Sequence, residues 1–277
     1  FIQKLKSEYL IKKGSSNFKK YIDSTKIFKI IDTHSNINKC IKKCDNIIKT
    51  NSVDLTINPE LNIIKIVKDK IKFKNSSSQP LNIPFICKKN NNNTNILYQL
   101  IYKKEDVRKD QLVCNIINIM DNILKTNGYD FHIITYNVLP LSKNSGIIEV
   151  VPQAKTIYHI KEKMNYSIQN YILECNTDKK VDVVKLKFIK SMAAYCVITY
   201  LLGIGDRHLD NIMISRCGAL FHIDFSFLLG YEPKPLAPSI RIIPEMIDVI
   251  GGIKSNNYQI FVEQCKICYN ILKKHCN

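Results

Sequence analysis

The apolar pattern of this chain changes near residues 149–153. Before this point, short runs of branched and aromatic residues alternate with turn-like clusters, which is typical of strands. After it, apolar residues recur every three or four positions, which is typical of helices. A strand-rich half followed by a helix-rich half predicts a two-lobed α+β fold. The length of 277 residues agrees, because a single core seldom extends beyond roughly 250 residues.

The strand-rich half predicts an antiparallel sheet with one helix lying against it. The helix is indicated by an apolar stripe that stops at Asn127-Gly128 and consists of Leu112, Ile116, Ile119 and Ile123. Strands are expected at residues 61–74, 85–87, 96–102, 131–138 and 146–151.

The helix-rich half contains one long predicted helix that ends at Gly203. Its apolar stripe has the spacing of one helix face and consists of Val184, Phe188, Met192, Tyr195, Ile198 and Leu202. We expect residues 1–50 to be a helical or linker segment, residues 51–152 an N-lobe with a hinge at its end, and residues 153–277 an incomplete C-lobe.

The net charge of +17 rests on 41 basic residues, of which only four are arginine. Arginine is the better phosphate-binding residue, so we interpret the excess lysine as compositional drift at solvated positions. A basic face attracted to an anionic membrane is the alternative. A nucleic-acid partner is not expected, because lysines are spread along the chain without aromatic interleaving.

Two classes of protein are disfavoured by the apolar runs and the cysteines. The longest nearly uncharged apolar run, residues 193–204, is shorter than the ~20 residues that a spanning helix needs. Ten cysteines in 277 residues are too dilute for a disulfide scaffold, which favours a reducing, cytoplasmic setting.

The residues that carry chemistry lie between Gly203 and Gly230. Two strand-like runs flank Arg216-Cys217-Gly218 and predict a hairpin. Pairing centred between Cys217 and Gly218 would place Asn211 opposite Asp224, with Cα atoms roughly 5 Å apart. Amide and carboxylate oxygens suit Mg²⁺, whose remaining positions commonly hold water and phosphate.

Asp206, His208 and Asp210 precede this hairpin and supply candidate acid and base groups beside the metal. Such a set suffices for phosphoryl transfer, which depends mostly on positioning and charge stabilisation. The segments GIGDRHLDN (203–211) and FHIDF (221–225) resemble the catalytic and metal-binding loops of the phosphatidylinositol 3- and 4-kinase superfamily. SIQNYI (167–172) and EPKPLAP (232–238) resemble its class III, vacuolar-sorting type.

The resemblance covers about residues 55–277 and implies a C-terminally truncated, two-lobed kinase fold. It implies transfer of the ATP γ-phosphate to the 3-hydroxyl of phosphatidylinositol, with Mg²⁺ as the metal and Mn²⁺ as its substitute. It further implies a cytoplasmic, peripheral location at endosomal or vesicle membranes, a role in membrane trafficking, and a regulatory kinase-like subunit.

Residue by residue, the resemblance implies a catalytic and metal set of Asp206, His208, Asn211 and Asp224. His208 is the preferred proton acceptor, and Asn211 and Asp224 hold the metal. The implied nucleotide-binding residues are Ser77 and Ser78 near the phosphates, Lys103 on the phosphates with Lys104 as its rival, Asp110 deep in the pocket, Tyr136 in the inner pocket, and Glu149 and Val151 in the hinge that holds adenine.

Lys234 and Arg241 would contact the lipid headgroup. Two cations favour an unphosphorylated headgroup, because additional phosphates would lack counter-charge. Ser226 stands where the family has glycine, and a serine fits only if φ there is negative. The alternatives are therefore a kinase-like binding module without turnover and a phosphatidylinositol 4-kinase.

Two further groups have structural readings. Cys265, Cys268, His275 and Cys276 invite a zinc site, but helical spacing favours packing for the first two. His222 shares a strand face with Asp224, and we expect it to be structural.

Overall fold

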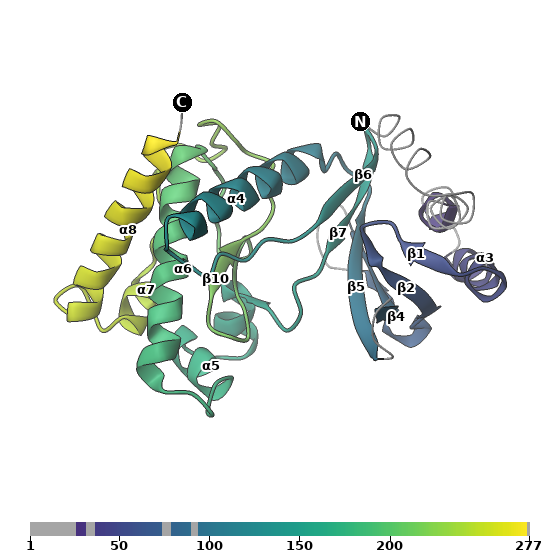
Figure 1. Cartoon of the computed structure of the whole chain (residues 1–277), viewed down its shortest axis with the longest axis horizontal. Helices are drawn as coiled ribbons and strands as arrows, with labels where there is room; N and C mark the ends of the chain where they lie inside the picture. Colours follow the sequence, from purple (N-terminus) through teal and green to yellow (C-terminus); the bar gives the residue numbers. More distant parts are fainter. Residues whose placement is uncertain (1–25, 32–36, 74–78, 90–93, 276–277) are drawn as a thin grey trace. The chain divides into compact units, whose positions relative to one another are not determined.

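The computed structural model describes residues 26–31, 37–73, 79–89 and 94–275 (Figure 1). The chain forms two compact units. The first, here called the sheet unit, contains the described residues up to Gln111 together with Asn137–Val150. The second, here called the helical unit, contains Leu112–Tyr136 and the described residues from Val151 onward.

The sheet unit is built on a seven-stranded antiparallel sheet with the strand order β1-β2-β4-β5-β7-β6, and β3 pairs with β4. A 3₁₀ turn, η1 (Lys68–Lys70), precedes β3. The strands are β1 (Val53–Leu55), β2 (Asn58–Ile66), β3 (Lys72–Phe73), β4 (Leu81–Lys89), β5 (Asn95–Lys103), β6 (Val138–Ser142) and β7 (Ser145–Glu149).

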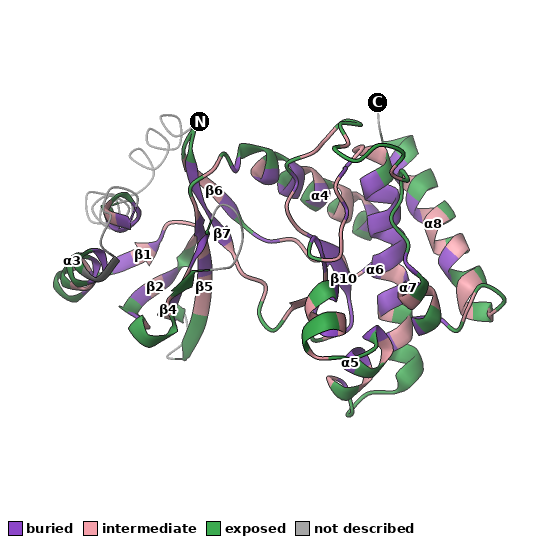
Figure 2. Ribbon diagram, turned by 180° about the vertical axis from the view of Figure 1, so that it is seen from behind, coloured by how far each residue is buried: buried purple, intermediate pink, exposed green. Residues whose placement is uncertain are grey.

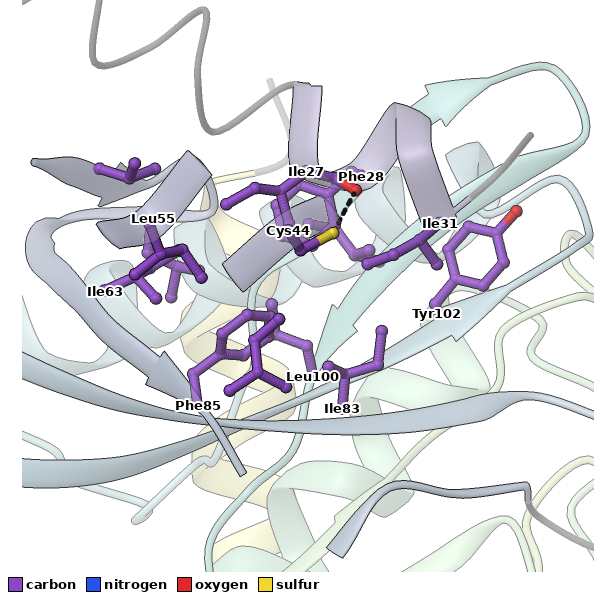
Figure 3. Packing of buried hydrophobic residues seen from close by; sticks show 14 of the residues in the cluster. Ile27, Phe28, Ile31, Cys44, Leu55, Ile63, Ile83, Phe85, Leu100 and Tyr102 are labelled. Carbon is purple, nitrogen blue, oxygen red and sulfur yellow. Dashed lines mark hydrogen bonds between the residues drawn. The ribbon is translucent and has the colours of Figure 1, made fainter. Parts of the chain in front are cut away.

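Helices cover this sheet through an apolar core. Helix α3 (Ile37–Thr50) and the helical residues 26–31 contribute to that core. Phe28 and Phe85 meet edge to face with their ring centroids 6.5 Å apart, and both are fully buried (Figure 3). The Cys44 thiol points to the Ile27 carbonyl, and burial raises its pKa to about 12. The core of this unit is therefore almost entirely apolar.

The helical unit is organised around α6 (Val181–Leu201), which is buried along most of its length (Figure 2). Five of the six residues of the expected stripe are buried, and the helix ends just before Gly203, which confirms the prediction. The other elements are the rest of α4 (Arg108–Thr126), β8 (Lys155–Thr156), η2 (His159–Lys163, a π-helical turn), α5 (Ile168–Glu174), β9 (Ile212–Ile214), β10 (Leu220–His222), α7 (Pro244–Val249) and α8 (Asn256–Lys274).

Two predictions about secondary structure are wrong. The segment 131–138 does not pair as a strand before Val138, and its Ile134 carbonyl accepts from the hydroxyl of the distant Tyr195 instead. Helix α4 forms where expected, with its residues from Leu112 onward in the helical unit, but the predicted apolar stripe is not its buried face. Leu112 and Ile119 of the expected stripe are exposed, whereas the buried face carries Val113, Cys114, Ile117 and Leu124.

The cysteines of the described chain are free thiols. Cys265 and Cys268 lie on α8, and burial raises the pKa of each thiol to about 12. Cys276 lies outside the described residues, and no metal-binding group of three or more His, Cys, Asp or Glu occurs within them. These thiols therefore pack as helix residues. No described helix is both long and apolar enough to cross a membrane.

Candidate active site

The hairpin of β9 and β10 positions the candidate metal ligands. Leu220 pairs with Ile214 and His222 with Ile212, so the turn is centred on Cys217. The predicted centre between Cys217 and Gly218 is therefore wrong by half a residue, which shifts the pairing register by one residue. Asn211 lies opposite Ile223, whose N–H donates to the Asn211 carbonyl at 3.0 Å, and not opposite Asp224.

The three-residue turn explains this shift. The Ser215 hydroxyl accepts from the Ala219 N–H at 3.0 Å, and the Ser215 N–H donates to the Ala219 carbonyl at 2.9 Å. Gly218 has φ +88°, the left-handed residue that ends such a turn. A turn of this length needs the serine hydroxyl and the glycine together.

Two aspartates of the site have left-handed backbone conformations, Asp206 with φ +54° and Asp224 with φ +60°. Only a few per cent of non-glycine residues have positive φ, and aspartate tolerates it better than most. Ser226 is not among the residues with positive φ, so the condition for a serine at that position is met. Its hydroxyl donates to Asp224 Oδ1 at 2.9 Å.

Arg207 ties the two loops together. The side chain is buried, and its guanidinium donates to main-chain carbonyls of both segments. Nε reaches the Gly205 oxygen at 2.8 Å, Nη1 reaches the Ile223 oxygen at 2.8 Å, and Nη2 bonds the Asp224 oxygen. A planar group with several donors can bond three carbonyls at once. Arg207 therefore fixes the backbone next to Asp206 and at Asp224.

Asn211 is oriented as a metal ligand would be. Its Nδ2 donates to the Asp206 carbonyl at 3.0 Å, which leaves Oδ1 as the end of the amide suited to a cation. The Asp224 carboxylate supplies the second hard oxygen ligand, which fits Mg²⁺. Two protein ligands are a normal number for a cation that also takes water and phosphate oxygens.

His208 and Asp206 face each other, with His208 Nε2 3.7 Å from Asp206 Oδ2. The His208 Nδ1 accepts from the Asp210 N–H at 3.2 Å, so the neutral ring carries its proton on Nε2. The Nδ1 lone pair is thus engaged by a main-chain N–H, and Nε2 lies on the side of the Asp206 carboxylate. Because Nδ1 is engaged, the Asp206 carboxylate is a second candidate proton acceptor beside His208.

Strand β8 of the three-stranded sheet and the residues after it bond the loop that contains Leu209 and Asp210. Thr156 on β8 donates through its hydroxyl to Asp210 Oδ1 at 3.1 Å, and the Tyr158 N–H donates to the Leu209 carbonyl at 3.1 Å. Asp210 is thus used for anchoring. Thr156 lies 54 residues before Asp210, and no sequence signal links the two.

Phe225 and His222, which lie on either side of Asp224 in the sequence, make aromatic contacts. Tyr136 is buried and stacks on Phe225 with ring centroids 6.4 Å apart, and the Arg207 guanidinium lies 5.7 Å from the centre of the Phe225 ring. His222 is buried and stacks on Tyr195 at 5.0 Å. Burial and the nearby Arg207 charge hold the pKa of His222 well below its usual value, so the ring is neutral and structural.

The predicted nucleotide-binding residues Lys103, Asp110 and Glu149 all lie in the sheet unit. Lys103 is mostly buried and pairs with Glu105 at 2.5 Å, whereas its rival Lys104 is exposed. Asp110 is buried in the first turn of α4. Glu149 accepts from the Asn137 side chain at 2.8 Å.

Other predicted contacts are less closely defined. Val151, which begins the next part of the helical unit, is half-buried, and Arg241 is exposed. Ser77 and Ser78 lie outside the described residues.

The segment after Asp224 contacts the loop that carries Asp206. Lys234, a predicted headgroup residue, lies with Nζ 3.4 Å from Asp206 Oδ1. The Glu232 Oε2 accepts from the Asp206 N–H at 2.9 Å. The sequence alone assigns no role to Glu232, Arg207 or Thr156, although Arg207 sits inside the motif and could have been found there.

The family described as "Phosphatidylinositol 3- and 4-kinase" matches residues 97–183 and 160–277. "Phosphatidylinositol 3-kinase pik3" of Schizosaccharomyces pombe is 36% identical over 235 residues, which are 82% of this chain and 29% of that protein. "Phosphatidylinositol 3-kinase VPS34" is 35% identical in Saccharomyces cerevisiae, over 83% of this chain and 26% of the yeast protein. The Arabidopsis thaliana protein of that name is 35% identical over 80% of this chain and 27% of its own length.

The chain thus spans between a quarter and a third of the length of these relatives. The family match covers more than half of the chain, and the two-lobed, kinase-like α+β fold agrees with it. The chain belongs to the phosphatidylinositol 3- and 4-kinase family.

Proposed function

We propose that this chain is the catalytic part of a lipid kinase that transfers the ATP γ-phosphate to the 3-hydroxyl of phosphatidylinositol, giving phosphatidylinositol 3-phosphate. Relatives named phosphatidylinositol 3-kinase support the reaction class. The observation that carries the proposal is the convergence of Asp206, Asn211 and Asp224 around Arg207.

In such a transfer each of these residues would have its own role. Asn211 Oδ1 and the Asp224 carboxylate would hold Mg²⁺, which supplies charge neutralisation at the phosphates when bound. The Asp206 carboxylate would accept the proton of the inositol hydroxyl, and the proton of His208 Nε2 would stabilise that carboxylate. Lys103 and Asp110 would serve the nucleotide, with Glu149 and Val151 as the hinge and Tyr136 in the inner pocket.

The lipid would be met by the segment around Lys234, which carries little positive charge and therefore favours a headgroup without further phosphates. We place the reaction at the cytoplasmic face of endosomal or vesicle membranes, with a regulatory kinase-like subunit as a partner. Residues 51–152 and 153–277 would be the two lobes.

The test is transfer of labelled phosphate from ATP to phosphatidylinositol by the full-length protein, followed by identification of the product. We expect 3-phosphate, and at least a hundredfold lower turnover for Asp224→Asn, because the variant removes a charged metal ligand. A 4-phosphate product would instead assign a phosphatidylinositol 4-kinase. Nucleotide binding without transfer would assign a binding module.

A further inference from the structure

We propose that Glu232 is a positioning residue that holds Asp206 in its left-handed conformation. The inference rests on the proposed function, because Asp206 is the proton acceptor in that proposal. It concerns a side chain outside both catalytic motifs, in the segment that the sequence assigns to the lipid headgroup.

Both carboxylate oxygens of Glu232 are engaged by main-chain donors. Oε2 accepts from the Asp206 N–H at 2.9 Å, and Oε1 accepts from the Lys234 N–H at 3.0 Å. Bonds from an N–H to an ionised carboxylate are stronger than those between neutral groups. One side chain therefore connects two segments that lie 26 residues apart in the sequence.

The chain makes room for this bond at Gly205. A Cβ atom at that position would lie 2.6 Å from the Tyr231 carbonyl oxygen and 2.9 Å from Glu232 Oε2. The Gly205 N–H also donates to the Phe227 carbonyl at 3.1 Å. The close approach of the two backbones thus requires glycine, and it brings the Glu232 carboxylate to the amide of the next residue.

Asp206 needs such an external bond because its φ of +54° is unfavourable for a residue with a side chain. The same segment also presents Lys234, whose Nζ lies 3.4 Å from Asp206 Oδ1. Glu232 therefore fixes the main chain of Asp206. Through the Lys234 N–H it also fixes the main chain of Lys234, whose side chain pairs with the Asp206 carboxylate.

The test compares Glu232→Ala and Glu232→Gln in the full-length protein, with Glu263→Ala as the matched control. Glu263 is an exposed glutamate on α8 that pairs with Lys266 at 3.8 Å. We expect kcat to fall about 100-fold in the alanine variant and about 10-fold in the glutamine variant, which keeps one acceptor oxygen. The KM for ATP should stay within about twofold in both, since the loss is confined to the transition state.

Hydrogen exchange at the Asp206 amide gives a readout that does not depend on activity. We expect at least roughly tenfold faster exchange in Glu232→Ala than in the wild type and no change in Glu263→Ala. If the alanine variant fails to fold, the glutamine variant decides.

Unchanged kcat and unchanged exchange would overturn the inference, as would a rise in the KM for ATP that accounts for the whole loss. A wild-type protein without lipid phosphorylation would overturn the proposed function, and faster exchange would then still establish the bond between Glu232 and Asp206.

Discussion

The two antiparallel sheets of this protein are stabilised in different ways. The seven-stranded sheet is held by buried apolar side chains such as Phe28, Phe85 and Leu100. The three-stranded sheet β8–β10 leads directly into the site, where Arg207 and Thr156 hold the loops through hydrogen bonds. The hydrophobic effect does not depend on the orientation of the buried groups, whereas a hydrogen bond requires a particular distance and angle. The first sheet should therefore govern stability and the second should govern geometry.

The largest expected effect is on the stability of the large sheet. Phe85→Ala should lower the free energy of unfolding by about 3–5 kcal/mol, because it removes a fully buried ring that contacts Phe28. Urea unfolding of the protein measures this. The control is Phe73→Ala, since Phe73 on β3 is 61% exposed and should change the free energy by less than about 0.5 kcal/mol. Equal losses in the two variants would contradict an apolar core as the source of stability.

Arg207→Lys should lower stability less than Phe85→Ala does, and its main effect should be on turnover. The lysine keeps the charge but its single ammonium group cannot bond the Gly205, Ile223 and Asp224 carbonyls together. We expect a loss of about 1.5–3 kcal/mol in unfolding free energy and about a 100-fold lower kcat.

Arg216→Lys is the control for this change. Arg216 is exposed in the turn of the same hairpin and donates to the Gln153 side chain at 2.9 Å. In the control, kcat from steady-state kinetics and the free energy of unfolding from urea unfolding should equal the wild-type values. A normal kcat in Arg207→Lys would show that the polar contacts do not set the geometry of the site.

The smallest effect concerns pH. The folded-state pKa of His222 lies well below its unfolded value because of burial and the Arg207 charge. Stability is then fully present above the unfolded pKa of about 6.5 and is lost as the pH falls, because only the unfolded chain gains the proton. The slope contributed by this residue should approach 1.4 kcal/mol per pH unit.

His222→Phe keeps a ring to stack on Tyr195 and should remove that slope. Urea unfolding at about pH 7.5 and 5.5 in both proteins gives the difference. Comparing the two proteins cancels His132, whose pKa burial also lowers. Parallel pH profiles would mean that His222 titrates normally.

The sequence predicts the elements that local patterns determine. The long helix α6 follows from one apolar stripe, and the α+β division follows from the change of period near residue 150. The hairpin between Asn211 and Asp224 also follows, although its register is shifted by one residue. That shift depends on the Ser215 hydroxyl closing a three-residue turn, which the strand pattern does not encode.

Contacts between distant residues account for what the sequence could not predict. The run 131–138 alternates like a strand, yet its carbonyl at Ile134 is taken by the Tyr195 hydroxyl, 61 residues away. The roles of Thr156 and Glu232 arise in the same way, from side chains that reach loops far along the chain. The tautomer of His208 depends on a backbone N–H that only the folded loop supplies.

The left-handed backbone at Asp224 has a consequence for how related domains are found in genomes. A search pattern that demands glycine at position 226 assumes that this position needs the conformational freedom, but here the positive φ belongs to Asp224. A pattern that fixes aspartate at 224 and accepts serine at 226 would retain this chain, whereas a strict glycine pattern would discard it. Catalogues built on the strict pattern would undercount such domains and would assign some of them to inactive proteins on the basis of one hydroxyl group.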